Sequence, residues 1–386
     1  MHDQSTQQQA AIFDMARRFG ADQIAPFASE WEAAGTIPRD LWAKAAALGF
    51  GGLYVGEDHG GAGLSRRDAT SVFEALSMAC PAVAAFLSIH NMAAGMIARF
   101  GDAHAHARWL PRAVAMETIF SYCLTEPGSG SDAAALRTRA EARPESRGGG
   151  WVLNGTKAFI SGAGYSDAYI VMARSGGPGA KGISAYVVEA GTPGLSFGPP
   201  EDKMGWRAQP TAQVQFDDCV IPAQNLLGEE GRGFAYAMAG LDGGRLNIAA
   251  CALGGAQSAM DKTLKYMSER KAFGQPLDQF QALQFRLAEI EVKLQSARSF
   301  LHHAANMLDG GAAEAAKFCA MAKLLVTDNA FDAANQCLQL HGGYGYLADY
   351  GIEKIVRDLR VHQILEGTNE IMRVIIARSL LAGRSG

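Results

Sequence analysis

The spacing of apolar residues changes twice along this chain, and these changes restrict the folds that it can adopt. Residues 8 to about 118 follow helical spacing, and "SVFEALSMACPAVAAFLSIHNMAAGMIARFG" is almost wholly apolar. From residue 119, short β-branched or alternating stretches such as "DAYIVMAR" alternate with Gly- and Pro-rich turns. Helical spacing returns after "IPAQNLLGEEGRGF". The sequence therefore predicts an α+β protein with a helical segment at 1–118, a β domain at 119–228 and a helical segment at 229–386.

Local signals refine this plan. Asn154-Gly155 lies between two apolar runs and predicts a hairpin turn. In the last segment, "QFRLAEIEVKLQSARSFLHHAANMLDGG" and "AAEAAKFCAMAKLLVTDNAFDAANQCLQLHGG" are longer than an average helix and have the spacing expected of helices in a bundle.

Composition excludes several classes of function. The net charge is −4 and no run of Lys and Arg could follow a phosphate backbone, so we expect no nucleic-acid partner. The 6 cysteines contain no C-x-x-C pair and the 9 histidines no H-E-x-x-H, which favours a reducing compartment and no metal site. We find no window with the length and character of a membrane span and no signal peptide. We therefore expect a bacterial cytoplasmic protein, with the mature form of a mitochondrial matrix protein as the alternative.

Three glycine-containing motifs are candidate sites. The lone G-x-S-x-G at 194–198 lies between β patterns, without the helix that a hydrolase nucleophile requires. The loop "TEPGSGSDAA" offers backbone N–H groups and hydroxyls that suit phosphate or a flavin edge, although taken alone such a loop is more often an ordinary turn closing a β domain. "QLHGGYGY" ends a helix, and its glycines either cap that helix or let a ligand approach the backbone.

Glu366 is the strongest candidate for chemistry taken from the residues alone. It precedes Gly367 at a break between two apolar-faced segments, "IEKIVRDLRVHQIL" and "IMRVIIARSLL". Burial at such a break disfavours the ionised carboxylate and raises its pKa toward the range of a general base. Thr368 or Asn369 can cap the following helix. The alternative is an acid placed in the first turn of that helix.

Five stretches in this order, "YCLTEPGSGSD", "TKAFISGAG", "RKAFGQPL", "QLHGGYGY" and "ILEGTNEIMR", closely resemble the acyl-CoA dehydrogenase family over essentially the whole chain. The resemblance implies an N-terminal helical domain, a middle β-barrel or sandwich domain and a C-terminal four-helix bundle. It also implies non-covalent FAD, an acyl-CoA substrate, electron-transferring flavoprotein as electron acceptor, and a homotetramer built as a dimer of dimers.

The resemblance carries over to particular residues. Those matching the family's flavin contacts are Tyr122, Leu124, Thr125, Gly130, Ser131, Phe159, Ile160, Ser161, Arg270, Phe273, Phe280, Gln281, Gln339, Leu340, His341, Gly342, Gly343, Thr368, Asn369 and Glu370. Those matching acyl-CoA contacts are Ser131, Asp242, Gly243, Gly244, Arg245 and Arg378. Asp242 stands where related enzymes tend to have Asn.

By the same resemblance, Glu366 removes the α-proton of a thioester while the β-hydrogen leaves as hydride to the flavin. Some family members carry the base on another helix in a pattern like L-D-x-E-R, but this chain has Gly244 at that place, in "GLDGGRLNIAA". This leaves Glu366 as the base consistent with the family.

The substrate expected from the resemblance is short and branched. "SGGPGAKGISAYVVEAGTPGLSFG" and "GWRAQPT" look most like the branch of the family that oxidises isobutyryl-CoA in valine degradation. 2-Methylbutyryl-CoA and butyryl-CoA are the alternatives, because one methylene changes binding by only about 1–3 kcal/mol. From other classes, we considered an acyl-CoA oxidase, which usually has a further C-terminal domain that we do not expect here, and a non-catalytic flavin-binding scaffold, which would lack the base.

Overall fold

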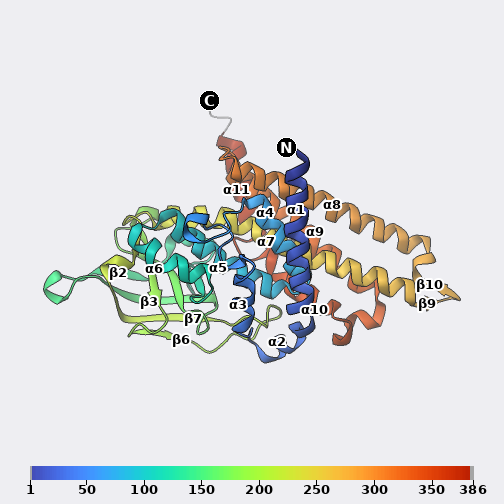
Figure 1. The fold of residues 1–386 in the computed structure, drawn as a ribbon, viewed down its shortest axis with the longest axis horizontal. Helices are drawn as coiled ribbons and strands as arrows, with labels where there is room; N and C mark the ends of the chain where they lie inside the picture. Colours follow the sequence, from blue (N-terminus) through green and yellow to red (C-terminus); the bar gives the residue numbers. More distant parts are fainter. Residues whose placement is uncertain (1, 383–386) are drawn as a thin grey trace.

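The computed structural model describes residues 2–382, with side chains from residue 7, and has helical, β and helical segments in that order. Figure 1 shows the sheet on one side of the molecule and the first helices in the middle. The C-terminal part of α7 (Gly233–Glu269) and α8 (Gln281–Asp309) extend to the opposite side. The expected α+β class is confirmed.

The first segment contains α1 to α6, whose bounds are His2–Gln23, Ala28–Ala34, Asp40–Ala46, Arg66–Ser77, Pro81–Phe100 and Ala103–Val114. The last segment contains α7 to α11, at Gly233–Glu269, Gln281–Asp309, Ala315–Leu340, Ile352–Arg360 and Asn369–Ala382, and a hairpin of β9 (Lys271–Ala272) and β10 (Gln275–Pro276). One apolar core runs from α1 through α4, α7, α8 and α9, so the two helical segments are separate in sequence but share a core.

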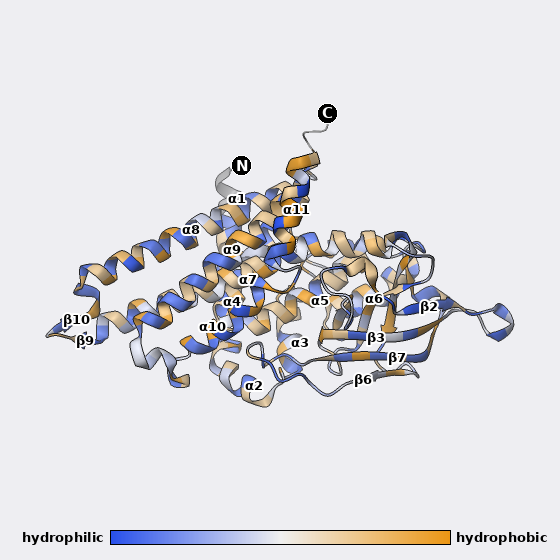
Figure 2. Cartoon of the chain, turned by 180° about the vertical axis from the view of Figure 1, so that it is seen from behind, coloured by the Kyte–Doolittle hydropathy of each residue, from blue (hydrophilic) through white to orange (hydrophobic). Residues whose placement is uncertain are grey.

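The helix α5 corrects one sequence expectation. Pro81–Phe100 is long and apolar enough to pass a length and composition test for a membrane span. However, 83% of its apolar window is buried inside the protein, where α5 packs against α4, α6, α7 and β1. Figure 2 shows its apolar character in the middle of the fold. A core helix needs the same composition as a spanning one because it is apolar on all sides.

The middle segment forms a mixed sheet in the order β6-β7-β3-β2-β4-β5-β8, with β1 paired in parallel to β4. The strands β1 to β8 span Phe120–Cys123, Arg139–Ala142, Trp151–Ser161, Ala168–Arg174, Ile183–Glu189, Leu195–Phe197, Thr211–Ile221 and Leu226–Leu227. Along β4, Ile170 and Met172 pack toward α5 and α7, whereas Tyr169 and Val171 pack against β3 and β7. Both faces are covered, which explains why this strand is apolar throughout rather than alternating.

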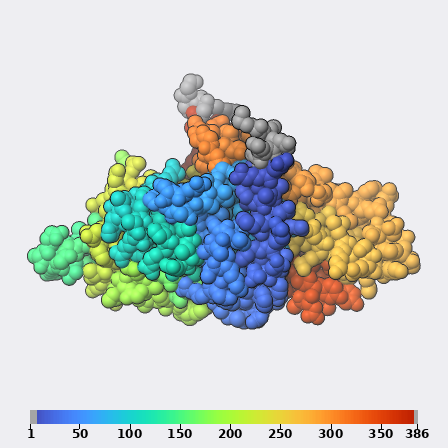
Figure 3. All heavy atoms as spheres, in the orientation of Figure 1, coloured from blue at the N-terminus to red at the C-terminus, as the bar shows by residue number. Residues whose placement is uncertain are grey.

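The expected hairpin at Asn154-Gly155 is wrong. β3 continues through both residues, and its pairing with β7 shifts register between Leu153 and Gly155. Gly155 has φ +146°, and a Cβ on it would lie within 2.9 Å of Thr138 on the neighbouring chain segment. The glycine therefore serves a bulge and a close backbone approach instead of a turn. Figure 3 shows the connection between β2 and β3 protruding at the left end of the molecule.

Candidate active site

The loop that carries Glu366 joins α10 to α11 and has two consecutive residues in the left-handed region. Glu366 has φ +55° and Gly367 has φ +88°. A non-glycine residue in this region costs roughly 1–2 kcal/mol, and such strain tends to persist where the surroundings hold it for function. α11 begins at Asn369, and Thr368 accepts a hydrogen bond from the Ile371 amide (3.3 Å), as expected of a cap. Glu366 therefore precedes the helix, and the acid in its first turn is Glu370.

The carboxylate of Glu366 is sheltered but not paired. Its Oε2 is buried without a hydrogen-bond partner, and burial raises its pKa to about 7 although Arg245 and Lys323 oppose the change. Arg245 directs Nε to the Glu366 backbone oxygen (3.4 Å) and Nη1 to Asp242 (2.6 Å). Lys323 donates to the Gly367 carbonyl (2.9 Å). Because both cations bind backbone, the carboxylate stays free to take up a proton near neutral pH.

The wall opposite the base is made of small and flexible residues. A Cβ on Gly244 of α7 would lie 2.7 Å from Glu366 Oε2 and 3.2 Å from the sulfur of Met92 on α5. The Tyr122 hydroxyl of β1 is buried without a partner. Its pKa is raised well above its usual range by burial and by the charge of Glu366. The loop at Glu366, α7, α5 and β1 thus come together near this carboxylate. A side chain at Gly244 would collide with the carboxylate.

The expected flavin loop, residues 122–131, rests on a buried ion pair. Lys157 of β3 donates to Glu126 (2.8 Å) and to the Leu124 carbonyl (3.0 Å), and its side chain is fully buried. Above this support, a Cβ on Gly128 or Gly130 would meet nothing within 4 Å. The ion pair therefore fixes the loop at Leu124 and Glu126, while the space beside Gly128 and Gly130 is open. A bound ring or phosphate requires this arrangement.

Phe159 stands out from β3 next to this loop. It has φ +58° and is 68% exposed, because the strand shifts register between Lys157 and Ile160. Ile160 itself is buried in the sheet, while Ser161 lies within 3.5 Å of Gln209. A bulge that directs a large aromatic ring into the open is costly for a protein without a ligand, and it suits stacking on a planar ring.

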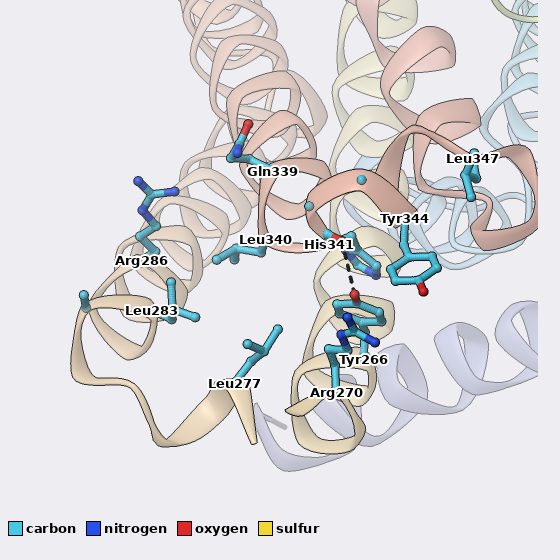
Figure 4. Close-up of a pocket in the computed structure, with 13 residues that line it drawn as sticks. Tyr266, Arg270, Leu277, Leu283, Arg286, Gln339, Leu340, His341, Tyr344 and Leu347 are labelled. Atoms are coloured by element: carbon cyan, nitrogen blue, oxygen red, sulfur yellow. Dashed lines mark hydrogen bonds between the residues drawn. The ribbon is translucent and has the colours of Figure 1, made fainter. Parts of the chain in front are cut away.

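A second group of expected flavin residues lines a cavity of about 700 Å³ between α7, α8 and the end of α9. Figure 4 shows Arg270 and Tyr266 on one side and Gln339 to Tyr344 on the other. Tyr266 donates to the His341 carbonyl (3.2 Å) and stacks on the His341 ring. Gly342 has φ +60° just beyond α9, so it does end the helix, and a Cβ on it or on Gly343 would meet nothing within 4 Å.

The remaining expected residues lie in different surroundings. Phe273 is 97% exposed and its ring lies 6.2 Å from that of Phe280. Asn369 is buried, and its amide is occupied by Lys323, Thr327 and Asp328. Arg378 is on the exposed side of α11.

Sequence reasoning missed four residues at the site: Arg66, Met92, Met96 and Lys323. Arg66 stacks on Tyr54 at 3.6 Å and would lie 2.4 Å from a Cβ on Gly243. The signal for Lys323 was available, since it is the one charged residue in the apolar run "FCAMAKLLV". A lysine there must find acceptors inside the protein.

Comparisons with known proteins agree with this geometry. The N-terminal, middle and C-terminal domain models of acyl-CoA dehydrogenase match residues 6–117, 121–219 and 231–381. The mitochondrial isobutyryl-CoA dehydrogenase of Bos taurus is 50% identical over 97% of this chain and 89% of its own. Butyryl-CoA dehydrogenase from Megasphaera elsdenii superposes with a TM-score of 0.93 at 35% identity, covering 97% of this chain and 98% of its own. The FAD complex of PigA superposes with a TM-score of 0.92 at 30% identity, covering 98% of each chain.

The residues of this chain also fit FAD. The open glycine loop, the outward-facing Phe159 and the glycine-edged cavity beside Arg270 offer a ring surface, backbone donors and a cation for a dinucleotide. The chain belongs to the acyl-CoA dehydrogenase family, the FAD-dependent oxidoreductases that dehydrogenate acyl-CoA thioesters.

Proposed function

We propose that this chain oxidises isobutyryl-CoA to methacrylyl-CoA, with Glu366 as the base that removes the α-proton. The observation that carries this assignment is the buried, unpaired Oε2 of Glu366 on a left-handed loop, with a pKa near 7. A carboxylate with this pKa is ionised in a useful fraction of molecules at neutral pH and can still accept a proton from a carbon acid.

The protein's own residues would perform most of the reaction. Glu366 abstracts the α-proton, Arg245 holds its backbone carbonyl, and Gly244 leaves room for the carboxylate to face the thioester. Bound FAD supplies the acceptor for the β-hydrogen. The buried surroundings of Glu366 exclude water and maintain its raised pKa. Asp242 belongs to this arrangement because its carboxylate forms an ion pair with Arg245 and holds that side chain in position.

A short acyl chain is supported by two methionines of α5. Met92 faces Gly244, and the sulfur of Met96 would lie 3.1 Å from a Cβ on Gly240, one turn earlier on α7. The two thioether side chains therefore fill space beside α7 that a longer acyl chain would need. The similarity to the bovine isobutyryl-CoA dehydrogenase favours isobutyryl-CoA within this size class. 2-Methylbutyryl-CoA and butyryl-CoA remain the competing substrates, because they differ by so few atoms.

We also propose that the site is completed by other copies of the chain in a homotetramer. The strand β3, which carries Phe159, and the β9–β10 hairpin, which carries Phe273, lie at opposite ends of the molecule in Figure 1. One dinucleotide contacting both would require a neighbouring subunit. The nearly fully exposed Phe273 is then covered by a partner.

Further assignments follow the family relation. We propose electron-transferring flavoprotein as the electron acceptor, and domains at 1–118, 119–228 and 229–386. We propose the cytoplasm of a bacterium as the location, with the mitochondrial matrix as the alternative that the bovine relative's name suggests. A non-catalytic scaffold would not need a strained, sheltered Glu366, so this alternative is disfavoured.

The test is anaerobic mixing of the purified flavoprotein with isobutyryl-CoA, 2-methylbutyryl-CoA and butyryl-CoA while flavin absorbance is followed. We expect isobutyryl-CoA to bleach the flavin fastest and Glu366→Gln to slow bleaching by about 10²–10⁴-fold, the usual contribution of a general base. Glu141→Gln, an exposed acid of β2, is the matched control and should behave as wild type. Unchanged bleaching by Glu366→Gln would remove the base assignment, and preference for another thioester would remove only the substrate assignment.

A further inference from the structure

Lys323 is a buried lysine whose bonds converge on the base loop. It lies on α9 with no exposed surface. Its Nζ donates to the Gly367 carbonyl (2.9 Å) and to Oδ1 of Asn369 (2.7 Å). A lysine is rarely buried unless acceptors compensate it, and here both acceptors belong to the segment directly after Glu366.

A network extends this hold to both sides of the loop. The amide of Asn369 donates to Thr327 (3.0 Å) and to Asp328 (2.7 Å) of α9. Gln363, before the base, donates to the same Asp328 oxygen (2.7 Å). Residues of α9 therefore form hydrogen bonds with the chain both before and after Glu366. These bonds explain how two consecutive left-handed residues are held in place.

The charge of Lys323 also acts on the base. Burial lowers the pKa of Lys323 to about 7, and Glu366 and Asp328 oppose this by favouring the ammonium. The other charged groups that face it are Arg245 of α7, which disfavours its charge, and Glu370 of α11, which favours it. Around Glu366 itself, the nearby groups are Arg245, Lys323 and the Tyr122 hydroxyl.

We propose that Lys323 is a positioning residue for the base: its ammonium holds the Glu366-Gly367 turn through the Gly367 carbonyl and Asn369, and its charge stabilises the ionised form of Glu366 without pairing with the carboxylate. A direct ion pair would occupy the carboxylate oxygens and lower the pKa of Glu366, which would make it a weaker base. A cation bound to the adjacent backbone gives part of the electrostatic benefit and leaves both carboxylate oxygens available. The inference rests on Glu366 as the base of the proposed function.

The first experiment measures the pKa of Glu366 directly, without substrate. Infrared difference spectra between the oxidised holoenzyme and its Glu366→Gln variant isolate the carboxyl stretch, which is followed across pH. The same pair is prepared in Lys323→Met, which removes charge and hydrogen bonds, and in Lys323→Gln, which removes the charge but keeps a donor. Thr327→Val is the matched control, since it removes a hydrogen bond to Asn369 in the same network without altering any charge.

We expect Lys323→Met and Lys323→Gln to raise the pKa of Glu366 by about one unit, the lower end of the roughly 1–3 units that a close opposite charge produces. Thr327→Val should leave this pKa unchanged. An unchanged pKa in both lysine variants, or an equal rise in Thr327→Val, would overturn the proposal. If Lys323→Met does not retain FAD or fold, Lys323→Gln decides the matter alone.

The second readout is the pH dependence of flavin reduction. Because the ionised fraction of Glu366 falls about tenfold per unit below its pKa, the lysine variants should lose about tenfold in rate at pH 6 and much less at pH 9. A loss that is equal at all pH values would indicate a purely structural role and contradict the electrostatic part. If isobutyryl-CoA fails to reduce even the wild type, the proposed substrate fails, while the infrared titration still tests Lys323.

Discussion

Gly244→Ala tests the geometry of the base with a single methyl group. The new Cβ would lie 2.7 Å from Glu366 Oε2 and 3.1 Å from its Cδ, whereas ordinary contacts begin at 3.4 Å. The carboxylate must therefore retreat by about 0.7 Å, and the sulfur of Met92, 3.2 Å from the new Cβ, is also crowded. A misplacement of about 1 Å can cost 10²-fold in rate, so we expect the rate of flavin reduction to fall between about 10-fold and 10²-fold.

The fold should tolerate the same substitution. Gly244 lies inside α7, where alanine is favoured over glycine by roughly 0.5–1 kcal/mol. This gain offsets part of the local crowding, so the melting temperature should change little. The substitution thus separates activity from stability, which most changes at buried sites do not.

The assay is anaerobic stopped-flow reduction of the flavin by isobutyryl-CoA, with the melting temperature measured on the same samples. Gly240→Ala is the matched control, because it lies one turn earlier on α7 and its Cβ would meet only the flexible side chains of Met96 and Met92. We expect Gly240→Ala to stay within a few-fold of wild type. A Gly244→Ala protein that reduces at the wild-type rate would refute the placement of the carboxylate against α7.

Three further predictions concern pH, the flavin loop and the dinucleotide cavity. The pKa of Glu366 is about 7 in the folded protein against 4.5 for the free side chain, so the unfolded state releases this proton first and the free energy of unfolding falls as pH rises from about 4.5 to 7. Because glutamine does not titrate, Glu366→Gln should be more stable than wild type at pH 8, by on the order of 3 kcal/mol, and not at pH 4; calorimetry showing the same difference at both pH values would contradict this. Lys157→Met leaves Glu126 buried without its cation, so the free energy of unfolding measured in urea should fall by about 3–5 kcal/mol, and the bound FAD should also decrease. An unchanged urea midpoint would show that the ion pair does not support the loop. Gly343→Val places its side chain in open space, so the fold should persist while FAD affinity falls at least about tenfold, as measured by flavin retained on dialysis; full retention would place the dinucleotide elsewhere.

Some features of this protein follow from local sequence. The order of helical and β segments was predictable because periods of 3.6 and 2 are written into short stretches of the chain. The loop at Glu366 was predictable for a similar reason, since a glycine between two apolar helical stretches marks a break, and Gly367 does adopt a left-handed φ. The expected hairpin at Asn154-Gly155 failed because the same dipeptide also suits a bulge, and only the approach of Thr138 selects between them.

What surrounds the base was decided by the tertiary structure. Arg245, Lys323, Met92 and Tyr122 come from α7, α9, α5 and β1, and no local pattern states that these elements converge on residue 366. The apolar character of α5 does not say whether lipid or protein covers it, and packing against α4, α6 and α7 answers that question. Which elements form, and where an acid interrupts them, could be read from the sequence, because both depend on neighbouring residues. The pKa of that acid and the freedom of its carboxylate depend on burial and on charges brought from distant segments, and these arise only when the chain is packed.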